Sequence, residues 1–429
     1  MFFLSKLSGL LIFLSFLTTL YSYFFSENLL IIAGIFAWVS FLILFSSLKN
    51  KTIIIVLLIL SVFAFCFSYF NGYKIDFVKV FTVNQYLLTL LIGVGFLRLI
   101  ATPKKDKLTQ FPIGKDSFIK TYFGVHLFGS VINLSSLILV ADKMYKKSPL
   151  TNTQVVLLTR AFASDAYWSP FFVAFAAAIT YAPKLDTSII LLNGIVLAFF
   201  AFLITYFEVV KNKEFKLDEF RGYPLSFESL YVPFILAILV LVTNYIYPNI
   251  KVIVLISTFS IFITLLIFPF KKGLSQSLIK FNNHVIEELP KMKVEIALFL
   301  VAGMFGISIS SILIGLNLDL PFKIFDWQIA SILLFIFIML AFIGIYLIIK
   351  IVIIGDFLGG VNHTLLALTF LMAWSTTVST SPFSGLNLTI VARYNFDAKE
   401  IFRLNIFYAF KMYLICVFCL FILSKYLGL

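Results

Sequence analysis

The sequence predicts an all-α polytopic membrane protein, with about eleven transmembrane helices and two re-entrant hairpins in an inverted-topology repeat. Three observations predict this fold: an apolar composition, an uneven distribution of Lys and Arg, and a recurring Ser-Pro-Phe motif. Of the 429 residues, 61% are hydrophobic and 12% charged, against about 45–50% and about 25% in soluble proteins. This composition excludes a soluble enzyme, a secreted disulfide-rich domain, a disordered protein and a nucleic-acid binder.

Eleven segments are apolar enough to span a bilayer, which takes about 20 residues of helix. No small-residue cleavage site follows the first segment, so we expect a transmembrane helix there and not a removed signal peptide. Two further apolar segments, 118–141 and 328–352, are either full spans or hairpins that enter and leave on one side. The eleven spans are expected at residues 7–25, 28–48, 52–71, 80–97, 155–182, 187–209, 229–247, 250–270, 294–314, 361–392 and 404–424.

Positive charge decides between these alternatives, because Lys and Arg gather in the cytoplasmic loops of membrane proteins. If both ambiguous segments spanned the membrane, the Lys-rich loops 98–117 and 211–228 would lie on opposite sides. With two hairpins, 24 of the 33 Lys and Arg residues lie in cytoplasmic loops and six lie outside. The charge pattern therefore predicts both hairpins, a cytoplasmic N-terminus and an external C-terminus, although 328–352 is apolar enough to span the membrane alone.

The Ser-Pro-Phe motif at residues 169–171 recurs at 381–383, an offset of 212 residues. Each half of the chain has three spans, a hairpin, a broken helix and a final span. Because each half crosses the membrane an odd number of times, the halves insert in opposite orientations, as in many secondary transporters. The predicted divisions are an extra helix at 1–27, a first repeat at 28–210, a cytoplasmic linker at 211–228 and a second repeat at 229–429.

Pro170 and Pro382 lie within the long apolar segments 155–182 and 361–392 and are expected to break both helices. Unpaired backbone at membrane depth is tolerated only where protein or a water-filled cavity satisfies it. Half-helix N-termini suit anions, and unwound carbonyls suit Na⁺. The alternative is a proline kink whose hydroxyls bond back to their own helix. The predicted substrate-binding residues are Ser169, Thr376, Thr377, Ser381, Ser384, Asn387 and Arg160, and the predicted coupling-ion residues are Asp165, Ser164, Asn133 and Ser135.

Two charged residues stand out in the first broken helix, because charges inside a membrane segment are costly and usually functional. We expect Asp165 to bind a coupling proton or Na⁺. Arg160 either holds a substrate carboxylate or sulfonate, or extends to the cytoplasmic interface. His126 is interpreted as a packing residue. The scattered Cys and His residues give no metal-ligand spacing, so no metal site and no cofactor beyond the coupling ion are expected.

With this order of elements, residues 28–424 resemble the ion transporter superfamily, which includes the divalent anion–sodium symporters and related carboxylate carriers. The resemblance lies in the layout of spans, hairpins and broken helices, with Asn133-Leu134-Ser135-Ser136 at the first hairpin tip. It implies a secondary transporter of the bacterial inner membrane that moves a small anion with H⁺ or Na⁺ and is not an enzyme. The alternative is a membrane-embedded polysaccharide or lipid flippase or polymerase. The expected partners are the solute and the lipid bilayer, without nucleic acid, and a homodimer is compatible with the sequence.

Overall fold

The computed structural model describes residues 2–48, 51–101, 111–223, 231–317 and 322–429. Helices occur at all eleven predicted spans, and eight of the described helices are long and apolar enough to cross a membrane. The remaining predicted spans are a shorter helix at Tyr231–Ile246 and the two segments that contain the proline breaks. The prediction of an all-α polytopic membrane protein is therefore confirmed.

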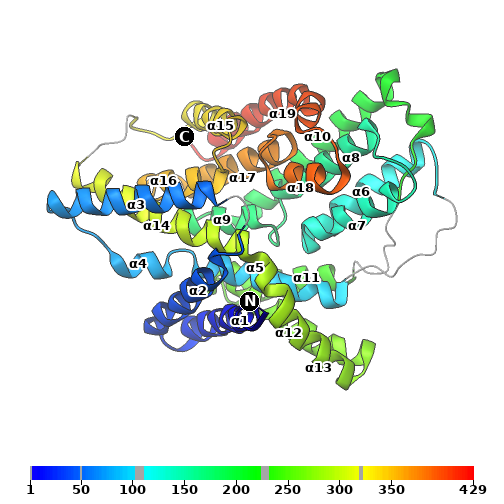
Figure 1. Cartoon of the computed structure of the whole chain (residues 1–429). Helices are drawn as coiled ribbons and strands as arrows, with labels where there is room; N and C mark the ends of the chain where they lie inside the picture. The colour runs from blue at the N-terminus through cyan, green and yellow to red at the C-terminus, as the bar shows by residue number, and fades with distance from the viewer. Residues whose placement is uncertain (1, 49–50, 102–110, 224–230, 318–321) are drawn as a thin grey trace. The chain divides into compact units, whose positions relative to one another are not determined.

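The chain divides into two compact units, and unit 1 comprises residues 1–101, 232–321 and 351–359. Helices α1 and α2, in dark blue in Figure 1, pack against each other. Helix α5 lies close to α12, because Gly93 has no side chain: a Cβ there would be 3.0 Å from the Cα of Ser257. The main helices of unit 1 are α1 (Phe2–Phe25), α2 (Leu30–Phe45), α3 (Thr52–Phe70), α4 (Phe77–Thr82), α5 (Gln85–Ala101), α11 (Tyr231–Ile246), α12 (Val252–Lys272), α13 (Leu274–Asn283) and α14 (Lys293–Gly315).

Large apolar side chains are exposed along the spans of unit 1. On α3, Phe63 is 75% exposed and Phe70 is 84% exposed. A soluble monomer rarely exposes apolar surface in contiguous patches of this kind, whereas the hydrocarbon of a bilayer solvates them. The outer faces of these helices therefore fit a lipid environment.

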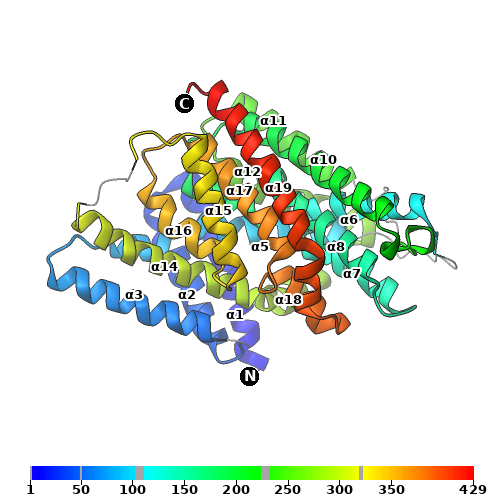
Figure 2. The same cartoon turned by 90° about the horizontal axis from the view of Figure 1, so that it is seen from above.

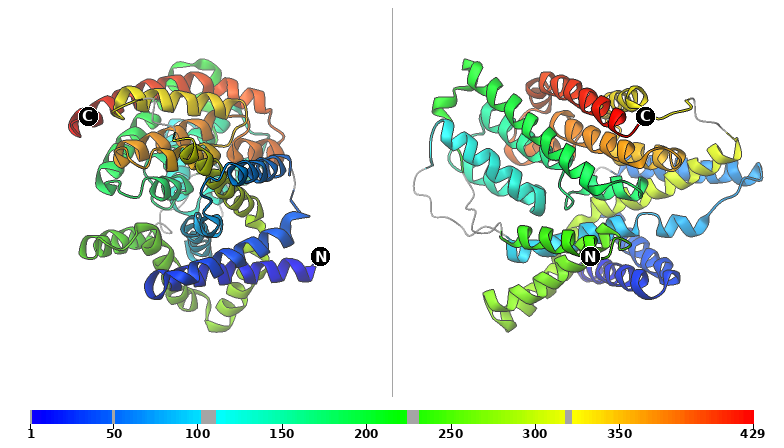
Figure 3. Two further views of the ribbon diagram at one scale, coloured as in Figure 1. Left: turned by 90° about the vertical axis from the view of Figure 1, so that its left-hand side faces the viewer. Right: turned by 180° about the vertical axis from the view of Figure 1, so that it is seen from behind.

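Unit 2 comprises residues 102–231, 322–350 and 360–429 and contains both Ser-Pro-Phe motifs. Helix α17 is buried along nearly its whole length and packs beside α15 and α19 (Figure 2; right view of Figure 3). The main helices of unit 2 are α6 (Lys115–Ile132), α7 (Leu134–Tyr145), α8 (Asn152–Ala163), α9 (Val173–Tyr181), α10 (Thr187–Lys211), α15 (Trp327–Phe342), α17 (His363–Thr380), α18 (Gly385–Tyr394) and α19 (Ala398–Tyr426).

Both predicted hairpins are pairs of helices joined by a short turn. In the first, α6 and α7 meet at Asn133, whose φ of 51° lies in the left-handed region, which Asn adopts more readily than most residues. In the second, α15 is followed by α16 (Leu347–Phe357) after a turn at Gly344, whose φ is 95°. The entry of both hairpins into the membrane from one side stays a prediction.

The structure differs from the sequence predictions in one connector and in how the chain divides. The connector predicted at 271–293 is largely helical: α13 exposes Leu274 and Leu278 on one face. This difference arises because apolar residues four apart form a stripe along a helix.

Each compact unit takes helices from both halves of the chain, so the spatial units and the predicted repeats are different divisions. Residues 102–110 of the charged loop 98–117, and 224–228 of the linker 211–228, lie outside the described residues.

Candidate functional site

The first broken helix begins with a capping box and ends beside Pro170. Helix α8 starts after Thr151, whose side chain caps the backbone N–H of Gln154. The helix tightens into a 3₁₀ turn at Ser164–Tyr167, and α9 resumes at Val173. In the gap, the Ser169 hydroxyl donates to the carbonyl of Ser130 in the first hairpin and accepts the N–H of Phe171. The serine thus satisfies one N–H of the break and one carbonyl near the end of α6.

The second broken helix repeats this arrangement. Helix α17 ends at Thr380, and α18 begins at Gly385 with Ser384 as its cap. The Ser381 hydroxyl donates to the carbonyl of Ala341 in the second hairpin (2.7 Å) and accepts the N–H of Phe383 (3.2 Å). In both breaks, therefore, a serine hydroxyl donates to a carbonyl near the turn of the preceding hairpin and accepts an N–H of the break itself.

The two broken helices also touch each other within unit 2. The Ser375 hydroxyl donates to the carbonyl of Ala163 at 2.8 Å, and these residues are 212 positions apart, the offset of the Ser-Pro-Phe motif. Nearby, the Tyr167 hydroxyl lies 3.4 Å from the Thr376 hydroxyl. Residues at corresponding places in the two halves thus meet at the contact between the breaks.

A carboxylate and an imidazole are buried beside the first break. Asp165 is fully buried, and its Oδ1 lies 2.8 Å from Nδ1 of His126 on α6. No hydrogen bond of good geometry reaches either oxygen of Asp165 from the described residues. An ionised carboxylate without a compensating partner is costly in such a place, so the imidazole is the group that makes its burial tolerable.

Trp168 determines which nitrogen of His126 carries a proton. The indole Nε1–H of Trp168 lies 3.2 Å from Nε2 of the imidazole, and an indole can only donate. Nε2 must therefore accept, which places the proton of a neutral ring on Nδ1. That nitrogen faces Asp165 and lies 3.0 Å from the Ser164 hydroxyl and 3.1 Å from the carbonyl of Ala161.

Gly129 allows the hairpin to approach this pair closely. A Cβ at Gly129 would collide with Oδ2 of Asp165 and would lie 3.1 Å from the ring of Phe162. The carboxylate thus lies against the backbone of α6 one turn before the hairpin turn. Any movement of α6 relative to α8 would change the surroundings of Asp165 directly.

The other predicted coupling-ion residues lie at the hairpin turn. Nδ2 of Asn133 is 3.5 Å from the carbonyl of Phe171, which follows Pro170. Ser135 is half-buried, and its neighbour Ser136 bonds to the carbonyl of Asn133. The structure therefore brings Asn133 to the first break, as expected for a hairpin tip, whereas Ser135 makes no hydrogen bond that links it to the break in the described residues.

The hydroxyls predicted to bind substrate are mostly engaged with backbone. Thr376 and Thr377 bond to the carbonyls of Met372 and Ala373 at 2.8 and 2.7 Å, as in the back-bonded alternative. Ser384 donates to the carbonyl of Val378 and accepts the N–H of Asn387. These hydroxyls stabilise the break in the state described here.

Asn387 is different, because one end of its amide has no partner. Its Nδ2 donates to the carbonyls of Ser379 and Ser381 at 3.2 and 2.8 Å. Its Oδ1 is buried and accepts no hydrogen bond from the described residues. A buried acceptor without a donor costs about 1–3 kcal/mol, so this oxygen is an available contact for a donor or a cation.

Arg160 does not join this cluster. The guanidinium is 1% exposed, and all three of its nitrogens bond to protein: Nε to Asn405 (2.8 Å), Nη1 to Glu208 (2.6 Å) and Nη2 to the carbonyl of Leu404 (2.8 Å). It also lies 4.3 Å from the ring centre of Tyr408. Sequence reasoning offered substrate binding or an extended position at the interface, but here Arg160 ties α8 to α10 and α19. We therefore do not retain it as a substrate ligand.

Sequence reasoning missed the role of His126, which was interpreted as a packing residue, and the role of Trp168. A signal for His126 existed, because an intramembrane acid requires a cationic or hydrogen-bonding partner. In the hairpin 118–141 only Lys120, near its start, and His126 offer a group that can carry positive charge. Among the residues that the structure describes, no cluster of His, Cys, Asp and Glu could hold a metal ion.

Comparison with solved structures shows a likeness in fold. A crystal structure of the YdaH transporter from Alcanivorax borkumensis, described as having an unusual topology, is similar with a TM-score of 0.57 and 11% sequence identity. The similarity covers 87% of this chain and 98% of that chain. No protein-family model and no curated protein matches the sequence. The chain therefore has the fold of a transporter, and the comparison does not assign it to the ion transporter superfamily.

Proposed function

We propose that this protein is a secondary active transporter of the bacterial inner membrane, which moves a small anion together with a proton. The observation that carries the proposal is the buried Asp165–His126 pair, placed between a helix break and a hairpin. Intramembrane acids with a titratable partner form proton relays in pumps and transporters. The fold shared with a known transporter supports the same reading.

The proton is the better candidate for the coupling ion than Na⁺. A Na⁺ site needs several oxygen ligands around one point, whereas the close polar neighbour of Asp165 is an imidazole nitrogen at 2.8 Å. Oδ1 of Asp165 and Nδ1 of His126 are close enough for a proton to pass between them once the ring and the carboxylate align. We therefore assign the proton to this pair.

The second break supplies the solute site in this proposal. The backbone N–H groups at the start of α18 favour the anionic group of the solute. The free Oδ1 of Asn387 can only accept, so in this proposal it contacts a donor group of the solute and not its negative charge. The matching hydrogen bonds at Ser169 and Ser381 support an inverted repeat, in which each hairpin moves with its own broken helix.

Reconstituted vesicles test this function directly. The purified protein, in liposomes with an imposed pH gradient, is given a panel of radiolabelled carboxylates, sulfonates and inorganic anions. We expect at least one anion to accumulate with the pH gradient and equally well when choline replaces Na⁺. Accumulation that requires Na⁺ would overturn proton coupling. No uptake of any anion, together with translocation of a lipid-linked sugar, would favour the flippase alternative.

A further inference from the structure

Helix α13 follows α12 directly, at the end of a helix that is long and apolar enough to span a membrane (Figure 1). Helix α12 ends with Lys271 and Lys272, and Gly273, with a φ of 78°, turns the chain into α13. Lys271 donates to the carbonyl of Ile100 in the last turn of α5, at 3.0 Å. Helix α13 therefore begins where two spans of unit 1 end.

Aromatic contacts hold α13 against the sides of these spans. The ring of Phe281 lies 5.8 Å from the ring of Phe13 on α1 and 5.1 Å from the ring of Phe96 on α5. His284, which follows α13, lies 4.7 Å from the same Phe96 ring. Phe96 precedes Ile100 by four residues, about 6 Å along the helix axis. Helix α13 thus lies beside the last turns of the spans, at the depth of the membrane interface, and not beyond their ends.

The surface of α13 has an apolar face and a polar face. Leu274 is 66% exposed and Leu278 is 62% exposed, and residues four apart share one face of a helix. Ser277 is buried and faces the protein, whereas Gln276 is exposed and lies about 160° from Leu278 around an ideal helix. Amphipathic helices of this kind lie in the plane of the interface, with their apolar face between the headgroups and the acyl chains.

Basic residues flank the apolar face of α13. Lys272 and Lys280 are exposed, and neither forms an ion pair within the described part of the chain. The sequence predicts the loop 271–293 on the cytoplasmic side, where the leaflet carries anionic lipids. A long lysine stem can extend to a headgroup on its own, so the two ammonium groups need not converge on one phosphate.

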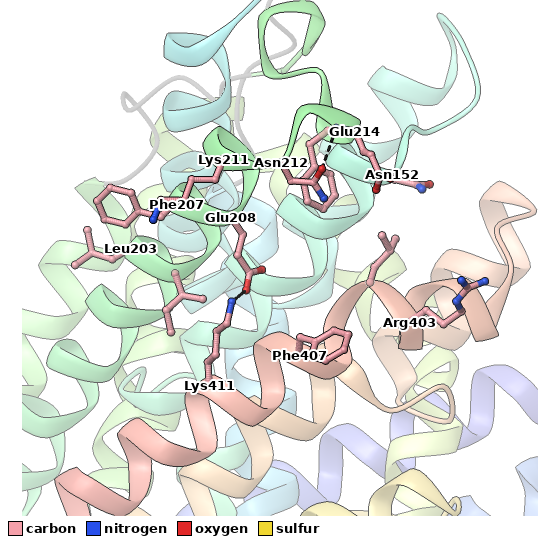
Figure 4. Close-up of a pocket in the computed structure, with 13 residues that line it drawn as sticks. Asn152, Leu203, Phe207, Glu208, Lys211, Asn212, Glu214, Arg403, Phe407 and Lys411 are labelled. Carbon is pink, nitrogen blue, oxygen red and sulfur yellow. Dashed lines mark hydrogen bonds and ion pairs between the residues drawn. The ribbon is translucent and has the colours of Figure 1, made fainter.

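The basic cavity between α10 and α19 in unit 2 is a weaker candidate for a lipid contact. It has a volume of about 1040 Å³. Figure 4 shows that Lys411 bonds to Glu208 and that Lys211 and Arg403 lie on opposite sides of the cavity. The basic groups there are either neutralised by an acid or too far apart to hold one headgroup.

We propose that α13 lies in the cytoplasmic surface of the membrane, inserts Leu274 and Leu278 among the acyl chains and binds anionic phospholipids through Lys272 and Lys280. A lipid leaflet fits this face better than a protein partner, because the apolar face lies beside the ends of spans and is flanked by basic groups. The contact anchors unit 1, which contains neither proline break, and it is independent of the transport function proposed above.

Insertion of α13 is tested on the full chain in lipid nanodiscs, with its three native cysteines replaced. Leu278→Cys is labelled with an environment-sensitive nitrobenzoxadiazole group, and the nanodiscs contain lipids that carry a nitroxide quencher near the headgroup end of an acyl chain. Gln276→Cys is the matched control, because it places the same label on the polar face of the same helix. We expect blue-shifted emission and strong quenching at Leu278→Cys, and neither of them at Gln276→Cys.

The preference for anionic lipid is measured at the same Leu278→Cys label. The nitroxide is attached either to phosphatidylglycerol or to chain-matched phosphatidylcholine, and the ratio of quenching gives the relative affinity of the two lipids at α13. We expect phosphatidylglycerol to be preferred. Lys272→Gln/Lys280→Gln should lower this preference by up to about 25-fold, since each basic residue near an anionic surface contributes about fivefold. The control Lys74→Gln/Lys79→Gln removes two exposed lysines of unit 1 away from α13 and should leave the preference unchanged.

Three results would overturn the proposal. Equal quenching at Leu278→Cys and Gln276→Cys would show that α13 does not present its apolar face to the acyl chains. Blue-shifted emission without quenching at Leu278→Cys would show that a protein surface, such as a second copy of this chain, covers that face. Equal association of the two lipids, or an equal loss in the lysine control, would remove the anionic preference. Monodisperse elution on size exclusion verifies that each variant is folded, and none of these measurements depends on transport.

Discussion

Replacement of Asp165 by Asn tests whether this side chain carries the coupling proton, because it changes little else at the first break. The amide has nearly the shape of the carboxylate, and its oxygen can take the place of Oδ1, 2.8 Å from Nδ1 of His126. Neither oxygen of Asp165 makes a hydrogen bond within the described residues that the change would remove. We therefore expect Asp165→Asn to fold and to lose only the group that exchanges a proton.

The expected effect on solute accumulation can be calculated if one carboxylate carries one proton for each solute molecule. A gradient of one pH unit stores about 1.4 kcal/mol per proton, which sustains an about tenfold accumulation of a coupled solute. In wild type, the logarithm of the accumulation ratio should therefore rise by about one for each pH unit. In Asp165→Asn it should stay near zero, while exchange of labelled for unlabelled solute continues.

The assay uses proteoliposomes whose membrane potential is clamped with K⁺ and valinomycin, so that the pH difference is the sole driving force. Asp116→Asn is the matched control, because Asp116 is an exposed acid in the first turn of α6. The control should keep the wild-type slope. An unchanged slope in Asp165→Asn would refute the assignment, since the coupling proton would then be carried by another group.

Three further changes test other parts of the structure. Glu208→Gln should lower the free energy of unfolding by about 3 kcal/mol, because Arg160 is 1% exposed and loses its anion; thermal unfolding in detergent measures it. Ser148→Cys, in a chain without its three native cysteines, should react with an impermeant maleimide from the cytoplasmic side. Asn387→Ala should weaken solute binding, measured by equilibrium binding at fixed pH, and leave the proton response intact.

Each of these changes has its own control and its own contrary outcome. Glu219→Gln affects a pair with Lys216 in which both side chains are exposed, so its cost should stay below about 1 kcal/mol. Equal destabilisation by Glu208→Gln and Glu219→Gln would mean that the Arg160 anchor is unimportant. Labelling of Ser148→Cys from outside alone would remove the first hairpin from the topology. Unchanged solute affinity in Asn387→Ala would place the solute elsewhere.

The sequence predicted the spans and the breaks because both depend on local properties of the chain. Hydropathy over about 20 residues locates a span, and Pro170 and Pro382 interrupt helices wherever the rest of the protein lies. The second break illustrates the limit of this reasoning. Its hydroxyls were visible in the sequence, but whether Thr377 faces its own helix or a ligand depends on side-chain rotation, and the structure shows it bonded to Ala373.

The partners of charged groups could not be derived in the same way. His126 and Asp165 are 39 positions apart in sequence, and Arg160 bonds to Asn405 across 245 positions. Such contacts depend on how helices pack, which hydropathy and charge counts do not specify. The rule that an intramembrane charge needs a partner limits the candidate partners to charged and hydrogen-bonding residues. Helix packing determines which of them is the partner, and for Arg160 it is Glu208 on another span.

The two breaks share a backbone arrangement and differ in chemistry, and the difference separates the proposed roles. At the offset of 212, Asp165 corresponds to Thr377 and His126 to Ile338, so the second break has no counterpart of the proton pair. The serines that hold each break to its hairpin are kept in both halves. If the backbone arrangement alone were functional, changes at either break would give one phenotype. Because the titratable pair occurs at one break and the free amide oxygen of Asn387 at the other, Asp165→Asn should abolish coupling while solute still binds, and Asn387→Ala should do the reverse.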